Sequence, residues 1–165
     1  MSKNYLEIEI TDPMVWMAGF RAMKMGALKN SITEGDANLE AFIAEEAVSR
    51  LLKQKLADTL DYDLLWAPNG NVLTADVKTK RRTKLPSPYF DCHIADTSLH
   101  QRCDTYIFTS IINDDDWYRL WVLGWLTREE FFERARRVLK GEKDGPFVEH
   151  VDGYKCKVAD LRPMP

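Results

Sequence analysis

Apolar and polar residues alternate with a period of two in several short segments, a pattern typical of β-strands with one buried face. In residues 5–10, for example, apolar side chains alternate with Glu7 and Glu9. Two longer apolar runs, 105–112 and 118–125, have the composition of central strands. Further strands are predicted at 62–67 and 72–80, joined as a hairpin across Asn69-Gly70, and a short strand with a loop is predicted in the tail at 154–158.

A period of three to four residues predicts three helices. The first runs from Pro13 to about Leu28, before a break at 31–35, and the second covers 36–57. The third begins with a capping box at Thr127–Glu130 and is expected to stop at Gly141. Residues 86–99 are expected to form a proline-bearing loop.

This order of elements predicts an α/β fold of the mixed α+β kind, in which a central mixed β-sheet is flanked by helices. A composition of 45% hydrophobic and 30% charged residues fits one domain over residues 1–165. Within it we distinguish an N-terminal strand and helix (1–35), a core (36–142) and a C-terminal strand and tail (143–165).

The three cysteines are expected to be free thiols. A chain of 165 residues buries roughly 70% of its unfolded surface, so the fold needs no disulfide or structural metal. Their odd number and the absence of a signal-like N-terminus favour the cytoplasm. Cys92, His93, His100 and Cys103 lack the tight pairs of a structural zinc site. No apolar run approaches the roughly 20 residues that span a bilayer.

The net charge of −3 is unusual for a protein that holds DNA, but the charges are unevenly distributed. Residues 78–84 contain five cations, and a second run from Arg134 to Lys140 places four more on the predicted third helix, whereas 114–116 are all acidic. Such an asymmetric surface can guide a polyanion. Ordinary solvated faces explain the same runs equally well.

The hairpin brings carboxylates together. In the strand 72–80, Asp76 and Lys78 point to the same face. A turn centred on Asn69-Gly70 places Asp63 opposite Asp76 and Asp61 opposite Lys78. Two carboxylates directly opposite each other on neighbouring strands repel at a cost of about 0.2–1 kcal/mol. A cation between them makes the interaction attractive.

Mg²⁺ suits this position because it prefers oxygen ligands and is commonly held by one or two carboxylates. Phosphodiester hydrolysis requires an activated water and stabilisation of developing negative charge, and a lysine beside the metal can contribute to both. The structural alternative is that Asp63, Asp76 and Lys78 lie on a half-exposed sheet, with Asp61 and Lys78 forming a simple cross-strand salt bridge. Spacing alone does not separate the two.

The wider context supplies five motifs, two of which contain the hairpin residues. A helix with AFIAEEAVSRLL (41–52) precedes DYDLLW (61–66) and VLTADVKTK (72–80), and CDTYIF (103–108) and VLGW (122–125) follow. In this combination the chain resembles the PD-(D/E)XK nuclease superfamily, and especially small phage-encoded members. The resemblance covers most of residues 36–142 and implies a restriction-endonuclease-like fold. Tyr62 stands where the motif has proline, and Ala41 and Ala44 stand where such helices have glycine.

The resemblance implies roles for individual residues. Asp63 and Asp76 match the two acidic residues of the motif and Lys78 its lysine, while Glu45, with Glu46 as the alternative, matches the carboxylate of the preceding helix. Some members also have a glutamine that contacts a water on the metal, and Gln101 lies in the corresponding region. The implied cofactor is Mg²⁺, for which Mn²⁺ can substitute.

The expectation is therefore a Mg²⁺-dependent DNA endonuclease of the cytoplasm. If it is phage-encoded, it acts in the host cytoplasm. A homodimer is one candidate assembly. Its catalytic residues are Asp63, Asp76, Lys78, Glu45 and Gln101, and its phosphate-binding residues are Lys80, Arg81, Arg82 and Lys84. One alternative is a nuclease-like DNA-binding or protein-interaction module without turnover, which the pI of about 5.7 favours. Another is a nuclease for RNA or branched DNA.

Overall fold

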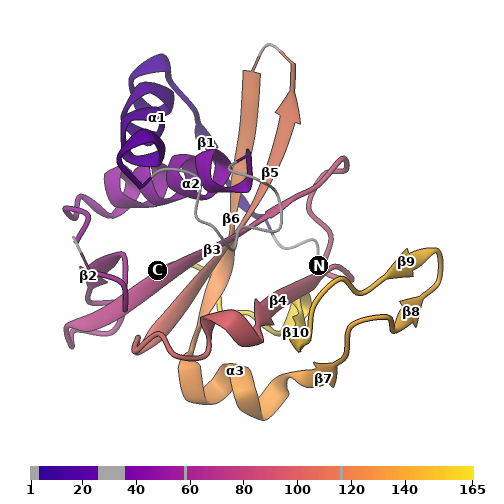
Figure 1. The fold of residues 1–165 in the computed structure, drawn as a ribbon. Helices are drawn as coiled ribbons and strands as arrows, with labels where there is room; N and C mark the ends of the chain where they lie inside the picture. The colour runs from indigo at the N-terminus through magenta and orange to yellow at the C-terminus, as the bar shows by residue number, and fades with distance from the viewer. Residues whose placement is uncertain (1–3, 26–35, 58, 116) are drawn as a thin grey trace.

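The computed structural model of the chain describes residues 4–25, 36–57, 59–115 and 117–165 (Figure 1). Its α-helices are α1 (Asp12–Met25), α2 (Asp36–Leu52) and α3 (Arg128–Arg134). Its longer strands are β1 (Leu6–Glu9), β2 (Leu64–Trp66), β3 (Leu73–Arg81), β4 (Asp91–Ala95), β5 (Thr105–Asp114), β6 (Trp117–Thr127) and β10 (Gly153–Lys157). The short strands β7 (Arg136–Val138), β8 (Lys143–Asp144) and β9 (Phe147–Val148) lie in the C-terminal part.

A five-stranded sheet with the order β1-β6-β5-β3-β2 forms the centre of the molecule. β3 and β5 are parallel, and every other neighbouring pair in this sheet is antiparallel. The sheet is therefore mixed, and the fold is mixed α+β, as the sequence predicts. β5 and β6 are the longest strands and form one antiparallel pair that passes through the whole molecule (Figure 1).

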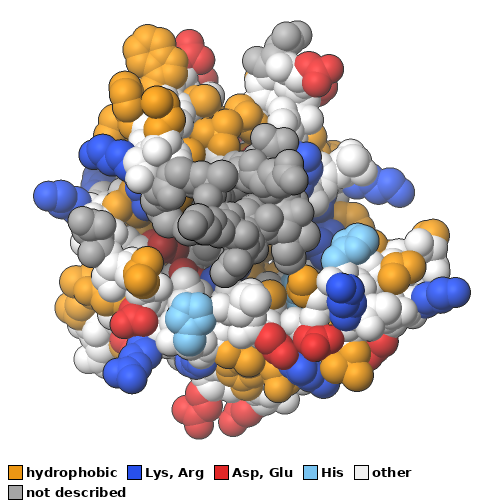
Figure 2. Space-filling view, viewed as in Figure 1, with side chains coloured by type: hydrophobic (Ala, Val, Ile, Leu, Met, Phe, Trp, Pro, Cys, Tyr) orange, Lys and Arg blue, Asp and Glu red, His pale blue; other side chains and the backbone are white. Residues whose placement is uncertain are grey.

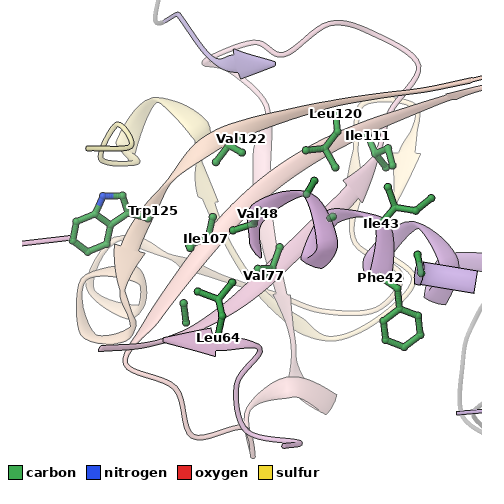
Figure 3. Close-up of a cluster of buried hydrophobic side chains, with 14 of the residues drawn as sticks. Phe42, Ile43, Val48, Leu64, Val77, Ile107, Ile111, Leu120, Val122 and Trp125 are labelled. Carbon is green, nitrogen blue, oxygen red and sulfur yellow. The ribbon is translucent and has the colours of Figure 1, made fainter. Parts of the chain in front are cut away.

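Each face of the sheet has its own hydrophobic core. On one face, α2 places Ile43 and Val48 against Val77 of β3 and Ile107 of β5 (Figure 3). On the other face, residues of α3, β4 and β10 pack around Tyr106. Burial of these apolar side chains is the main driving force that holds helices and sheet together.

A second sheet was not fully expected from the sequence. Its order is β4-β10-β7, and β8 pairs with β9 in a separate two-stranded ribbon. The predicted loop at 86–99 in fact contains β4, in which Cys92 and Ile94 are buried and their neighbours are partly exposed. β10 pairs with both β4 and β7, so it organises this part of the chain.

The predicted helices differ from the observed ones mainly at their ends. α2 ends at Leu52 rather than Ala57, because Lys53 adopts a positive φ of 52° that an α-helix does not accommodate. α3 begins with the predicted capping box but ends at Arg134, and Ala135 is extended. The predicted end of the first helix near Leu28 and the break at 31–35 lie outside the described residues.

The prediction of free thiols is confirmed, since Cys92, Cys103 and Cys156 are buried free thiols. Among the described residues, no helix has both the length and the apolar character needed to cross a membrane.

Candidate active site

The candidate site lies along the edge of β3 that β2 leaves open. β2 pairs only with Leu73–Ala75, in the register that the Asn69-Gly70 turn predicts, with Leu64 opposite Ala75. Asp63 immediately precedes β2, and its backbone N–H donates to the carbonyl of Ala75 at 2.8 Å. Its Oδ2 accepts a hydrogen bond from the backbone N–H of Val77 at 2.7 Å. The Asp63 carboxylate thus accepts the β3 hydrogen bond that the backbone of a longer β2 strand would otherwise accept.

Helix α2 supplies Glu45 to the same region. Both Glu45 and Glu46 are buried, with 8% of each residue exposed, but the charge of Glu45 is the one that acts on Asp63. The Oε2 atom of Glu45 lies 2.6 Å from Nη2 of Arg21, which reaches across from α1. The Arg21 guanidinium also lies over the ring of Phe42, 4.7 Å from its centroid. Arg21 is therefore held by both an ion pair and an aromatic face.

Lys78 connects Asp76 to Gln101. Its Nζ lies 2.5 Å from Oδ2 of Asp76 and donates a hydrogen bond to Oε1 of Gln101 at 2.9 Å. The amide nitrogen of Gln101 in turn donates to the carbonyl of Leu60 at 3.3 Å. Gln101 lies in the connection between β4 and β5, so three separate segments of the chain fix the position of one ammonium group.

Electrostatics distinguish Asp63 and Glu45 from surface acids. Burial raises the pKa of Asp63 well above its usual value, the charges of Glu45 and Asp76 raise it further, and the Val77 hydrogen bond only partly opposes this. Burial also raises the pKa of Glu45, against the influence of Arg21. Poorly hydrated acids this close together are unfavourable unless a cation compensates them.

Oxygen donors are available for such a cation. Oε2 of Glu45 and Oδ2 of Asp76 are buried, and each lies within ion-pair distance of one cation, Arg21 and Lys78 respectively. Carboxylate oxygens with spare acceptor capacity are the ligands that Mg²⁺ prefers. Among the described residues, however, no three His, Cys, Asp or Glu side chains form a ready metal-binding group. The donor types fit Mg²⁺, and in this conformation Arg21 and Lys78 provide the compensating charge.

The simple salt bridge expected as the structural alternative is absent from the described residues. Lys78 pairs with Asp76 on its own strand, and Oδ1 of Asp61 instead accepts a hydrogen bond from the backbone N–H of Arg102 at 3.3 Å. The cross-strand partner of Lys78 is thus not Asp61, because β2 starts only at Leu64.

The cationic run at 78–84 is divided between different environments. Arg81 pairs with Glu40 of α2, with 2.6 Å between Nη2 and Oε1, and Lys84 is exposed. Lys80 and Arg82 line a cavity between β3 and β4. Arg82 donates from Nη2 to the carbonyl of Asp91 at 2.6 Å and lies over the ring of Phe90.

The second cationic run does not lie on a helix as predicted. α3 ends at Arg134, and Arg136 and Arg137 belong to β7. Arg137 pairs with Asp96, with 2.8 Å between Nη2 and Oδ2, and Arg136 lies 3.9 Å from Oε2 of Glu142. Neighbouring carboxylates therefore compensate these arginines, so they give no continuous basic helix face.

Sequence reasoning did not identify Arg21 as a residue of interest, and it considered His93 only as a zinc ligand or as a loop residue. Arg21 lies in a helix of Met, Ala and aromatic residues, and nothing in its spacing relates it to Glu45. His93 lies in β4, where the alternation of buried Cys92 and Ile94 was a signal for a strand. That signal would have placed His93 opposite Lys155 once β10 was paired with β4.

Comparisons of the chain with protein-family models, with curated proteins and with solved structures give no match. Function is therefore inferred from the residues and geometry of the site alone.

Proposed function

We propose that this protein is a Mg²⁺-dependent nuclease of the PD-(D/E)XK type, with a restriction-endonuclease-like fold, that hydrolyses phosphodiester bonds in DNA. The observation that carries the proposal is the meeting of three carboxylates, Asp63, Asp76 and Glu45, with Lys78 at the open edge of β3. A purely structural sheet edge gains nothing from buried carboxylates whose charges raise the pKa of Asp63.

In this proposal Asp63, Asp76 and Glu45 hold the metal. When bound, Mg²⁺ supplies Lewis-acid stabilisation of the negative charge that develops on the phosphate and the leaving oxygen. Lys78 orients the attacking water and offsets phosphate charge, and Gln101 holds the Lys78 ammonium in position through the 2.9 Å hydrogen bond. Asp76 holds the Lys78 ammonium close to the reacting centre.

The resemblance to small phage-encoded nucleases extends the proposal. It favours DNA over RNA, cleavage within a strand and action in the cytoplasm. It leaves a homodimer as a candidate assembly. Lys80, Arg81, Arg82 and Lys84 are the proposed phosphate contacts, with Arg81 able to contribute only if its pair with Glu40 opens.

The test is cleavage of plasmid, linear duplex, branched DNA and RNA in Mg²⁺ and in Mn²⁺. We expect the wild type to cleave DNA, and Asp76→Asn and Lys78→Met to reduce kcat by at least about 100-fold, since each removes a group required in the transition state. Asp144→Asn, which changes an exposed acid on β8, serves as the matched control and should be active. Preference for RNA or for branched DNA would redirect the substrate assignment, and failure to cleave any substrate would argue against a nuclease.

A second candidate function is a nuclease-like module that binds DNA or protein without turnover. The observation in its favour is that Arg21 and Lys78 already neutralise Glu45 and Asp76, so the fold tolerates these acids without a metal. Calorimetry with Mg²⁺ and Mn²⁺ separates the two candidates. Salt-dependent DNA binding without metal binding would favour the inactive module.

A further inference from the structure

A cavity of about 150 Å³ lies between the central sheet and β4. Lys78 and Lys80 of β3 and Arg82 just after it form one wall, and His93 of β4 forms the opposite wall. Phe108 and Leu123, from β5 and β6, contribute apolar surface. The cavity adjoins the candidate active site, because Lys78 contacts Asp76 and also lines the cavity.

The cavity has an excess of positive charge. Among the described residues, neither Lys80 nor Arg82 forms an ion pair with a carboxylate. The one acid among the described lining residues, Asp91, is compensated by Lys157, with 2.9 Å between Oδ1 and Nζ. The nearby Lys155 pairs with Glu149, so it neither adds to nor cancels the excess.

Two polar groups beside the cavity also lack partners. Nε of Arg82 and Nε2 of His93 are buried and form no hydrogen bond within the described structure. Burial lowers the pKa of Lys80, and the charges of Arg82 and Lys155 lower it further. Desolvation and mutual repulsion both disfavour the charged forms of these cations. A bound anion would reduce both free-energy costs.

The size and donors of the cavity select the anion. Pockets for drug-sized ligands measure about 300–1,000 Å³, so a cavity of about 150 Å³ suits one small polyatomic group and not a nucleoside. An ammonium and a guanidinium together are the donors that proteins use for phosphate oxygens. Their two positive charges match the charge of about −1.5 to −2 on a phosphate monoester better than the single charge of a diester.

We propose that this cavity, with Lys80 and Arg82 as its anchors, binds a terminal phosphate of a nucleic-acid strand. The phosphate-binding part stands on the cavity itself, and the strand-end part rests on the proposed nuclease function. Since Lys78 joins the cavity to the carboxylates, a phosphate held there lies beside the bond to be cleaved. The strand end then determines where cleavage occurs.

The first experiment titrates the full chain with inorganic phosphate in chloride buffer of matched ionic strength, by calorimetry and by thermal unfolding. We expect saturable binding by the wild type and at least about tenfold weaker binding by Lys80→Gln and Arg82→Gln. Lys140→Gln removes the charge of an exposed lysine outside the cavity lining and should bind like the wild type. Arg82 also supports the Asp91 backbone, so Lys80→Gln is the decisive variant if Arg82→Gln does not fold.

The second experiment compares oligonucleotides that differ only in a phosphate or hydroxyl at the 5′ or 3′ end. We expect a phosphate at one end to lower KM at least about fivefold in the wild type, and Lys80→Gln to abolish that difference. Phosphate binding that Lys80→Gln and Arg82→Gln leave unchanged, or no binding at all, overturns the cavity assignment. Phosphate binding without an effect of the strand end overturns the terminal-phosphate part. Phosphate binding that depends on Lys80, in a protein that cleaves no nucleic acid, supports the cavity and refutes the nuclease function.

Discussion

Arg21 of α1 and Glu45 of α2 form an ion pair of 2.6 Å that places a guanidinium where the proposed metal would bind. The pair is largely buried, with 28% of the Arg21 side chain and 11% of the Glu45 side chain exposed. Metal binding at Glu45 must therefore displace Arg21 or share the carboxylate with it. On the proposed function, metal binding would therefore exchange one cation for another at Glu45.

Arg21→Gln should make stability depend on the metal. Without metal, removal of the guanidinium leaves Glu45 buried and unpaired, so the free energy of unfolding should fall by about 1–3 kcal/mol. In Mg²⁺ or Mn²⁺ the loss should be smaller, because the ion compensates the carboxylate and no longer competes with Arg21. Urea unfolding with and without metal measures both values.

Arg119→Gln is the control, since Arg119 forms an exposed pair of 2.8 Å with Glu7. Its loss should be at most about 1 kcal/mol, and the same with and without metal. Equal losses for Arg21→Gln under both conditions would show that Arg21 does not compete with a metal.

Asp63→Asn should stabilise the metal-free protein. Burial and the neighbouring carboxylates raise the pKa of Asp63 in the folded state, so its contribution to stability worsens as pH rises from about 4 through that raised pKa. Asparagine does not ionise, and its side-chain oxygen can still accept the Val77 hydrogen bond. Tm at pH 7 should rise by a few degrees, since about 1 kcal/mol corresponds to roughly 2–4 °C at this size.

The gain from Asp63→Asn should disappear below about pH 4, where the aspartate is neutral in both folded and unfolded states. The same variant should lose the increase in Tm that Mg²⁺ or Mn²⁺ gives the wild type. A lower Tm at neutral pH would contradict the view that burial and the neighbouring carboxylates make ionisation of Asp63 unfavourable in the folded state.

Gln101→Leu should slow catalysis without weakening metal binding. Leucine removes the acceptor at 2.9 Å from Lys78 Nζ, so the ammonium loses one of the two groups that position it. We expect kcat to fall about tenfold while calorimetric Mn²⁺ affinity is unchanged. Gln101→Glu retains an acceptor and should recover part of the rate, and Gln54→Leu, at an exposed residue after α2, should behave as wild type. A parallel loss of Mn²⁺ affinity would mean that Gln101 supports the metal and not the lysine.

Glu130→Gln should reduce stability in a pH-dependent way. Burial alone would raise the pKa of Glu130, but the hydrogen bond from Thr127 N–H and the pair with Arg162 outweigh it and lower that pKa. A lowered pKa stabilises the fold above the unfolded value of about 4.3, and this contribution is lost as pH falls through the folded pKa. The variant should lose about 1 kcal/mol at pH 7 and much less near pH 3. Glu129→Gln, exposed in the same turn, is the control in thermal unfolding at both pH values.

Short-range signals predicted the hairpin that builds the site. The Asn69-Gly70 turn, in which Gly70 has φ of 89°, determined the register that places Leu64 opposite Ala75. Because side chains alternate along a strand, that register also set which side of β3 carries Asp76 and Lys78. Spacing alone did not separate a metal site from an ordinary sheet edge, so the choice also depended on motifs elsewhere in residues 36–142.

Prediction failed where partners distant in sequence override local preference. The helix predicted to reach Gly141 ends at Arg134 because residues 136–138 pair with β10. β4 also depends on β10, which lies about sixty residues further along the chain. The local spacing of apolar residues carries no information about the energy of pairing with a strand elsewhere in the chain.

Arg21 illustrates the same limit for the site itself. Its position beside Glu45 comes from the packing of α1 on α2, and an isolated arginine in a helix carries no signal for a buried carboxylate elsewhere. The motif therefore identified the acids, while the residue that balances one of them became visible only in three dimensions.

The pairing of β1 with β6 and the contact of Arg21 with Glu45 have a consequence for how the protein can be divided. The segment before α2 looks like an appendage to the motif-bearing part of the chain, yet β1 covers one edge of the central sheet and Arg21 pairs with one acid of the candidate site. A fragment that starts at residue 36 would expose β6 as a new sheet edge prone to self-association. Neither evolution nor engineering can therefore remove the first strand and helix without changing both the sheet and the environment of Glu45.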